Sequence, residues 1–158
     1  MLSEQAKREI QKIREEVPDP QSALLPALYL AQREYAGWLP EQALDEVATL
    51  MELPAAHVAA VASFYRRLNK QPVGRHLVQV CTNIACSLLG AERLVEYIGR
   101  KLGIGVGETT PDGEFTLLEV ECLGSCGTAP AMQVDDRYYE NLTEETIDYI
   151  LDSFRRGE

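Results

Sequence analysis

The chain has 158 residues, of which 46% are hydrophobic and 25% charged, and its formal net charge is −10. This composition excludes an intrinsically disordered chain, and no apolar run reaches the ~18 residues of a membrane-spanning helix. The acidic balance argues against nucleic acid as a partner, because binding to phosphate needs a basic face. The N-terminus has a charged helical pattern unlike a signal peptide, so we expect a cytoplasmic protein with no direct membrane insertion.

Charge and cysteine are unevenly distributed along the chain. Residues 1–72 contain eight Lys/Arg and ten Asp/Glu, whereas residues 73–158 contain seven Lys/Arg and fifteen Asp/Glu. All four cysteines lie in the second, more acidic part. The composition changes at Gln71-Pro72-Val73-Gly74, which is a sequence typical of turns. We therefore predict two domains, 1–72 and 73–158.

The first domain is predicted to be a bundle of about four helices. Apolar residues recur at helical spacing and stop before Pro18, and a second such run ends near Gly37. Pro40 and Pro54 precede two further periodic runs, and a proline is favourable in the first turn of a helix. These two runs are expected to form helices at 41–51 and 55–65. No catalytic constellation is evident in this domain.

The second domain mixes strands and helices. In chain order, the expected elements are a strand at 76–81, a helix at 87–102, a strand at 115–121, a hairpin of 131–134 and 137–141, and a helix capped by Thr143. We expect Leu88 and Leu89 to belong to the apolar face of the first of these helices. The whole chain is therefore predicted to be an α+β protein, with a helical bundle followed by a βαβ-ββα domain.

The cysteines are placed at the ends of the two predicted strands. Cys81 ends the first strand and Cys122 ends the second, and a right-handed crossover between them makes the strands parallel. Both cysteines are then expected at the carboxyl edge of the sheet, where open α/β sheets bind their ligands. Cys86 and Cys126 follow within the same two loops.

The spacing of the cysteines favours a metal centre. Cys81 and Cys86 form a C-x4-C pair, and Cys122 and Cys126 form a C-x3-C pair. Two sulfurs bound to one tetrahedral metal lie roughly 3.7 Å apart, which loops of this length allow. Two facing pairs can therefore hold a [2Fe–2S] cluster. Gly124 and Gly127 allow positive φ near the sulfurs, so backbone N–H groups can turn toward the anionic cluster.

Three other interpretations of the cysteines stay open on spacing alone. A structural zinc site with four cysteine ligands also uses paired cysteines, and would make the chain a zinc-stabilised interaction module. A redox-active disulfide is less favoured because the sequence contains no C-x-x-C motif. Four unrelated core cysteines are less favoured still. The spacing also differs from the plant-type ferredoxin pattern, so a cluster here belongs to another ferredoxin type.

The acidic surroundings predict a low reduction potential for such a cluster. Residues 73–158 carry a net charge of −8, from seven Lys/Arg and fifteen Asp/Glu. Adding an electron next to this charge is unfavourable. We therefore expect a midpoint in the lower part of the range of about −700 to +450 mV that iron–sulfur clusters span.

Several segments resemble a known family. These are EYAGWLPEQAL, VAAVASFYRRL, VCTNIACSLLGAERL and GETTPDGEFTLLEVECLGSCGTAPAMQV, and they resemble the thioredoxin-like [2Fe–2S] ferredoxin subunit of NADH:quinone oxidoreductase, the E subunit of respiratory complex I. The resemblance covers the chain from about Pro26 to Phe154. It implies a thioredoxin-like second domain and one [2Fe–2S] cluster. It also implies that the cluster ligands are Cys81, Cys86, Cys122 and Cys126.

The resemblance also implies a place in a larger enzyme. It suggests a one-electron carrier without a catalytic site of its own, in the peripheral arm of a membrane complex. The partners would be a subunit that binds FMN and NADH, together with other hydrophilic subunits. The same module is similar to parts of NAD-linked formate dehydrogenases and NAD-reducing hydrogenases. We hypothesise that the helical bundle docks the flavin subunit.

Overall fold

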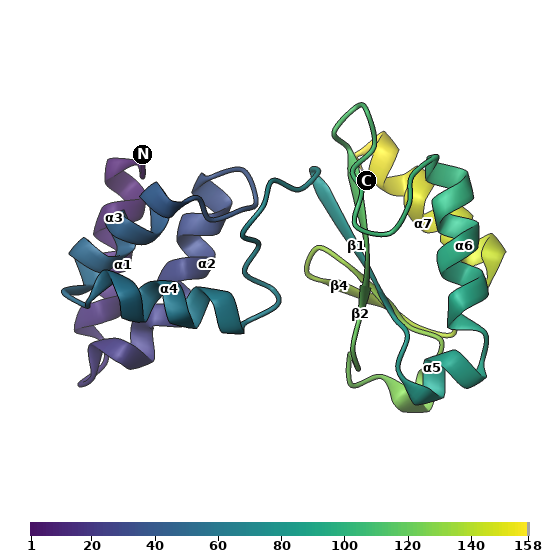
Figure 1. Ribbon diagram of the computed structural model, residues 1–158, viewed down its shortest axis with the longest axis horizontal. Helices are drawn as coiled ribbons and strands as arrows, with labels where there is room; N and C mark the ends of the chain where they lie inside the picture. The colour runs from purple at the N-terminus through teal and green to yellow at the C-terminus, as the bar shows by residue number, and fades with distance from the viewer. Residues whose placement is uncertain (158) are drawn as a thin grey trace. The chain divides into compact units, whose positions relative to one another are not determined.

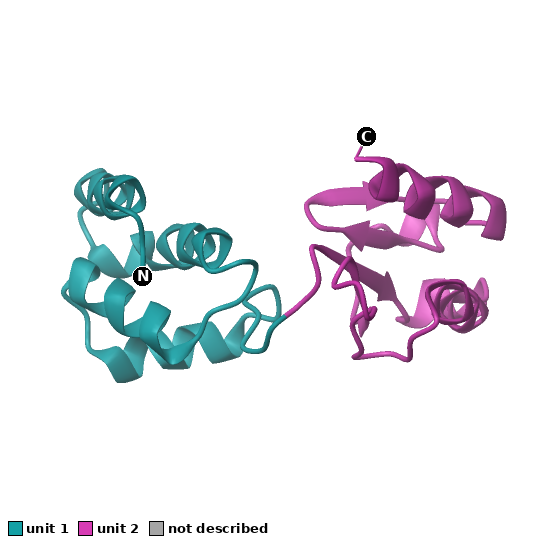
Figure 2. Cartoon of the chain, turned by 90° about the horizontal axis from the view of Figure 1, so that it is seen from above, with its two compact units in different colours: residues 1–72 teal, residues 73–158 magenta. Residues whose placement is uncertain are grey.

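The computed structural model describes residues 1–157, which form two compact units, residues 1–72 and residues 73–157 (Figure 2). This part of the chain contains seven α-helices and one four-stranded mixed sheet, so the fold is α+β. None of its helices is long and apolar enough to cross a membrane.

The first unit consists of four α-helices and a short 3-10 helix. They are α1 (Glu4–Glu15), the 3-10 helix (Pro20–Ala23), α2 (Leu24–Glu34), α3 (Glu41–Met51) and α4 (Ala55–Phe64). Pro40 and Pro54 precede α3 and α4, as predicted, but lie at the N-cap and not within the first turn. Each is the extended N-cap residue, and its carbonyl accepts the first hydrogen bonds of the helix, as Pro54 does from His57 N–H at 2.9 Å. The restricted φ of proline suits this extended position as well.

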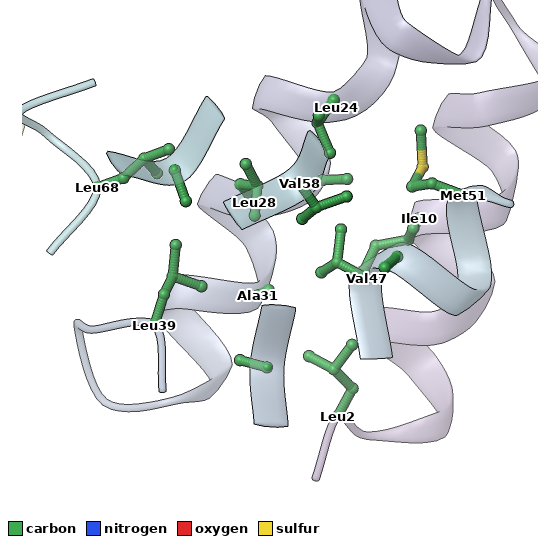
Figure 3. Packing of buried hydrophobic residues seen from close by; sticks show 14 of the residues in the cluster. Leu2, Ile10, Leu24, Leu28, Ala31, Leu39, Val47, Met51, Val58 and Leu68 are labelled. Atoms are coloured by element: carbon green, nitrogen blue, oxygen red, sulfur yellow. The ribbon is translucent and has the colours of Figure 1, made fainter. Parts of the chain in front are cut away.

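The apolar faces of these helices share one core (Figure 3). Its fully buried side chains come from each of the four helices, and include Ile10, Leu28, Val47, Met51 and Val58. The spacing of these residues at helical periodicity in the sequence is what places them on one face of each helix. Burial of these side chains supplies the main stabilisation of the unit.

A hydrogen-bonded group joins the N-terminus to α2 and α3 beside this core. The Glu46 carboxylate accepts hydrogen bonds from the Tyr35 hydroxyl at 2.8 Å and from Leu2 N–H at 2.7 Å. Burial and the neighbouring carboxylate raise the pKa of Tyr35 to about 12.

The second unit contains the sheet. Its elements are β1 (His76–Cys81), α5 (Ile84–Leu88), α6 (Ala91–Leu102), β2 (Phe115–Val120), a 3-10 turn (Cys126–Thr128), β3 (Met132–Val134), β4 (Arg137–Tyr139) and α7 (Glu144–Arg156). The strand order is β2-β1-β3-β4. β1 and β2 are parallel, as predicted, and the other two pairs are antiparallel. The peptide bond between Ala129 and Pro130, just before β3, is cis.

Helices α6 and α7 pack on the sheet and on each other (Figure 1). Their buried residues, among them Ile98 and Ile147, share a core with Leu117 and Met132 of the strands. Asp148 on α7 accepts a hydrogen bond from the Tyr97 hydroxyl at 2.7 Å and forms an ion pair with the Lys101 ammonium at 2.9 Å. These contacts join the two helices and lower the pKa of Asp148.

The predicted helix at 87–102 is wrong in one respect, because the structure divides it into α5 and α6. Gly90 adopts a left-handed conformation, with φ 87°, and serves as the N-cap of α6. The preceding helix begins earlier than predicted, at Ile84, because Asn83 caps it through a hydrogen bond from Ile84 N–H. Leu88 and Leu89 consequently lie outside the apolar face of α6, and both are exposed.

Candidate metal centre

The parallel pairing of β1 and β2 places the two cysteine loops at one edge of the sheet. Cys81 is the last residue of β1 and lies opposite Val120, the last residue of β2. Cys122 therefore lies two residues after the end of β2. The prediction from the sequence, that Cys122 ends this strand, is wrong by these two residues. Figure 1 shows α5, which carries Cys86, at this same end of the sheet.

Cys122 and Cys126 form an exposed pair. Their Sγ atoms are 3.4 Å apart, close to the roughly 3.7 Å between two sulfurs on one tetrahedral metal. Gly124 adopts a φ of 82° and donates its backbone N–H to Cys122 Sγ at 3.3 Å. This hydrogen bond and the one from Cys126 lower the pKa of Cys122, whereas the neighbouring Cys122 raises the pKa of Cys126. Gly127 also allows positive φ but does not adopt it.

Cys81 and Cys86 form a buried pair. Each residue is 2% exposed, and they pack with Ala91 and Ala131. Burial is the main cause that raises the pKa of Cys86, and its hydrogen bond with Cys81 adds to the effect. A hydrogen bond from the backbone of Ala131 acts in the opposite direction. The thiolate at Cys86 therefore needs a compensating positive charge, such as a metal ion, to persist at neutral pH.

The two pairs interact with each other across the edge of the sheet. Cys126 contributes to the raised pKa of Cys86, and Cys81 contributes to that of Cys126. The thiols are nevertheless grouped two by two. Across residues 1–157, no group of three or more His, Cys, Asp or Glu side chains is arranged to hold a metal ion.

A hydrogen bond between side chains connects the two cysteine loops. Asn83, which follows Cys81 by two residues, donates its Nδ2 to Glu121 Oε2 at 3.1 Å. The Oδ1 atom of the same side chain accepts Ile84 N–H at 3.0 Å and so caps α5. Asn83 thereby orients both the helix that carries Cys86 and the loop that carries Cys122. We did not predict this role from the sequence, although an Asn before an apolar run is a recognised helix-start signal.

A second polar contact holds the loop of the exposed pair. Glu140, which follows β4, accepts a hydrogen bond from the Thr128 hydroxyl at 2.6 Å and another from the Ser125 side chain. Both hydrogen bonds lower the pKa of Glu140, so the carboxylate is charged at neutral pH. Nothing in the sequence pattern indicated this contact, because it depends on the turn between β3 and β4.

Comparison with known proteins identifies the family. The sequence pattern described as thioredoxin-like [2Fe–2S] ferredoxin matches residues 10–155, and so includes helices of the first unit as well as the sheet. The chain is 45% identical to an NADH-quinone oxidoreductase E subunit of Rhizobium meliloti, over 96% of this chain and 90% of that protein. It is 38% identical to the NADH-quinone oxidoreductase E subunit of Pseudomonas aeruginosa, over 98% and 92%.

A solved structure extends the likeness to another kind of complex. The fold is similar to part of an NAD+-reducing [NiFe]-hydrogenase, with a TM-score of 0.72 and 27% identity. The similarity covers 85% of this chain and 23% of the hydrogenase chain. The family pattern spans nearly the whole sequence, and the curated relatives are matched over most of their length. The chain belongs to the thioredoxin-like [2Fe–2S] ferredoxin family.

Proposed function

We propose that Cys81, Cys86, Cys122 and Cys126 hold one [2Fe–2S] cluster and that the chain is a one-electron carrier. The arrangement of the thiols in two facing pairs carries this proposal. Each iron of such a cluster takes two protein ligands, so two pairs supply the complete set. When bound, the cluster would accept and release single electrons.

Membership of a [2Fe–2S] ferredoxin family favours a binuclear centre over a structural zinc site. A single zinc ion needs all its ligands around one point at about 2.3 Å from each sulfur. Cys122 and Cys126 are spaced for one metal of either kind.

The residues around the thiols have distinct roles in this proposal. The Gly124 N–H donates to the sulfur of Cys122, and such hydrogen bonds stabilise negative charge on the ligands. Burial of Cys81 and Cys86 keeps water away from one half of the centre. Exposure of Cys122 and Cys126 leaves the other half open to a partner.

The relatives suggest which complex the chain belongs to. We infer that it is the E subunit of an NADH:quinone oxidoreductase, next to a subunit that binds FMN and NADH and with other hydrophilic subunits of the peripheral arm. The names of the curated relatives support this assignment. An NAD-linked formate dehydrogenase or an NAD-reducing hydrogenase is the alternative host, and the hydrogenase similarity favours keeping it.

The helical bundle is proposed to take part in docking the flavin subunit. It presents an exposed pair of aromatic side chains, Phe64 and Tyr65, whose ring centroids are 5.2 Å apart. Exposed aromatic residues are enriched at protein interfaces. Deletion of residues 1–70 should therefore weaken co-purification with the flavin subunit, and intact co-purification would contradict this role.

Metal analysis of the anaerobically purified protein tests the cluster. We expect two irons and two acid-labile sulfides per chain, a red-brown colour and no stoichiometric zinc. Each of the four Cys→Ser variants should lose most of this iron, whereas Ser153→Ala, on α7, should retain it. One zinc per chain without sulfide would contradict the proposal, and so would wild-type iron content in any of the cysteine variants.

A further inference from the structure

One carboxylate, that of Glu140, is hydrogen-bonded on both sides of Cys126. Cys126 begins the 3-10 turn, Ser125 immediately precedes this turn, and Thr128 ends it. The Thr128 hydroxyl donates to Glu140 Oε1 at 2.6 Å, and the Ser125 side chain forms a second hydrogen bond with the same carboxylate. A hydrogen bond to a charged acceptor is about twice as strong as one between neutral groups. Glu140 therefore spans the short segment that contains one of the proposed cluster ligands.

The backbone that follows β4 brings Glu140 to this turn. Asn141 N–H donates to the Thr128 carbonyl at 2.7 Å, and Leu142 N–H donates to the Pro130 carbonyl at 3.1 Å. The Leu142 side chain is buried in the core of the second unit. These contacts do not involve the side chain of Glu140. The place of the carboxylate is therefore set by the fold, whereas the hydroxyls that it binds belong to the loop of the exposed cysteine pair.

The loop of the exposed pair is only partly buried. Cys122 and Cys126 are exposed, and Leu123 and Ala129 pack, partly buried, against the small core around the buried pair. A segment with little buried apolar surface opens locally at a low cost in free energy. The hydrogen bonds of Glu140 therefore contribute more to the position of this loop than they would in a densely packed segment.

We propose that Glu140 is a positioning residue for the metal centre, which holds Cys126 in place by linking Ser125 to Thr128. The inference rests on the proposed function and adds to the centre a residue that is not a ligand. Glu140 then has two separable effects. Its reach across the turn keeps Cys126 in the geometry that the metal needs, and its negative charge disfavours reduction of the centre.

Three variants of the cluster-loaded, full-length protein separate reach from charge. Glu140→Gln keeps the length of the side chain and an acceptor oxygen but removes the charge. Glu140→Asp keeps the charge but is one methylene shorter, so that it no longer spans both hydroxyls. Glu140→Ala loses both properties. Glu145→Ala is the matched control, because Glu145 is an exposed carboxylate in the first turn of α7 and lines the same surface pocket as Glu140.

Loss of visible absorption in the presence of a chelator measures the reach of Glu140. Removing a direct partner of a metal ligand lowers metal affinity about 10–100-fold, and Glu140 acts through its neighbours, so a smaller effect of about 5-fold faster loss is expected in Glu140→Asp and Glu140→Ala. Glu140→Gln should stay within about 2-fold of the wild-type rate because it retains an acceptor for the hydroxyls. Glu145→Ala should lose absorption at the wild-type rate.

The midpoint potential and the electron paramagnetic resonance spectrum report effects that a general loss of stability would not produce. Glu140→Gln and Glu140→Ala both remove the charge, so their midpoints should shift to more positive potential than that of Glu140→Asp. The g values of the reduced protein should instead change in Glu140→Asp and Glu140→Ala, because Cys126 is displaced, and should match wild type in Glu140→Gln and Glu145→Ala.

Variants of Thr128 test the same contact from the other side. Thr128→Val removes the hydroxyl and should also accelerate the loss of absorption, whereas Thr128→Ser should restore the wild-type rate. Residues in direct contact have non-additive effects. The double variant Glu140→Ala/Thr128→Val should therefore lose absorption no faster than Glu140→Ala alone, and rates that multiply would contradict a direct link. Should Glu140→Ala fail to fold, Thr128→Val still measures this contact.

The outcomes separate this inference from the proposed function. Wild-type decay and g values in Glu140→Asp and Glu140→Ala, in a protein that contains the [2Fe–2S] cluster, would overturn the positioning role and leave the electron-carrier role intact. A wild type that binds zinc and no iron would overturn the electron-carrier role. Faster release of that zinc from Glu140→Ala, followed with a chromogenic chelator, would in that case still support the positioning of Cys126.

Discussion

The four thiols experience different environments although they would serve one centre. Cys122 has a pKa lowered by the Gly124 backbone, whereas burial raises the pKa of Cys86. Metal ligation requires thiolates, so the exposed pair contains the cysteine that deprotonates most readily.

Asn83 is expected to act as a positioning residue for this centre. Asn83→Ala removes both the cap of α5 and the hydrogen bond to Glu121, and loss of such a cap costs about 1 kcal/mol. We predict severalfold faster loss of visible absorption when the loaded protein is incubated with a chelator. Asn83→Asp keeps a capping oxygen but loses the amide donor, so its decay should also exceed that of wild type. Wild-type decay in both variants would show that the link between the loops is dispensable.

The Tyr35–Glu46 hydrogen bond predicts a pH-dependent contribution to stability. The pKa of Tyr35 is raised from 10.0 to about 12, so the unfolded chain releases this proton at lower pH than the folded chain. The hydroxyl's contribution is therefore complete below pH 10 and is lost as the pH rises to about 12. Tyr35→Phe should lower the free energy of unfolding by about 1 kcal/mol at neutral pH. In urea titrations this difference should shrink between pH 10 and 12, and a constant difference would contradict the assignment.

At the scale of elements, local patterns predicted most of the fold. The buried residues of α7, the cap at Thr143 and the parallel pairing of β1 with β2 follow from periodicity, cap chemistry and crossover handedness. The break at Gly90 was missed because Leu88 and Leu89 continue an apolar pattern, and hydrophobicity does not report on backbone conformation. Those two leucines are exposed in the structure.

Gly90 is expected to be needed for the break between α5 and α6. Its φ is 87°, and a side chain in the left-handed region costs about 1–2 kcal/mol. Gly90→Ala should therefore lower the midpoint of thermal unfolding, although no atom lies within 4 Å of the added Cβ. Gly127→Ala is the control, since that site is equally open and its φ is not positive. Equal unfolding midpoints for the two variants would be inconsistent with backbone strain at Gly90.

At the scale of the whole molecule, chain topology explains the candidate site better than any local motif does. Cys81 and Cys122 are distant in sequence and meet at one sheet edge because β1 and β2 run in register, with Cys81 opposite Val120. The strand pattern and the cysteine spacing were enough to predict this. The contacts of Glu140 with Thr128 and Ser125 could not be predicted, because they depend on how the β3–β4 hairpin folds back.

The overall charge predicts a low reduction potential for the cluster. Residues 73–158 contain fifteen Asp/Glu and seven Lys/Arg. Two of these carboxylates lie close to the cysteine loops: Glu121 accepts a hydrogen bond from Asn83, and Glu140 accepts one from Thr128. Negative charge near the centre disfavours the reduced form, so a potentiometric titration should yield a midpoint below 0 mV, in the lower part of the range of about −700 to +450 mV. Glu121→Gln should move the midpoint to a more positive value. A positive wild-type midpoint would contradict this electrostatic argument.

Electron paramagnetic resonance of the anaerobically purified protein, before and after dithionite, tests the central claim most directly. Two bridged irons held by the two thiol pairs predict a silent oxidised sample and, on reduction, a spin-half signal that integrates to one per chain. Ser153→Ala should reproduce this signal, and Cys122→Ser should reduce or alter it. A sample that remains silent after reduction, with zinc bound in place of iron, would contradict the account.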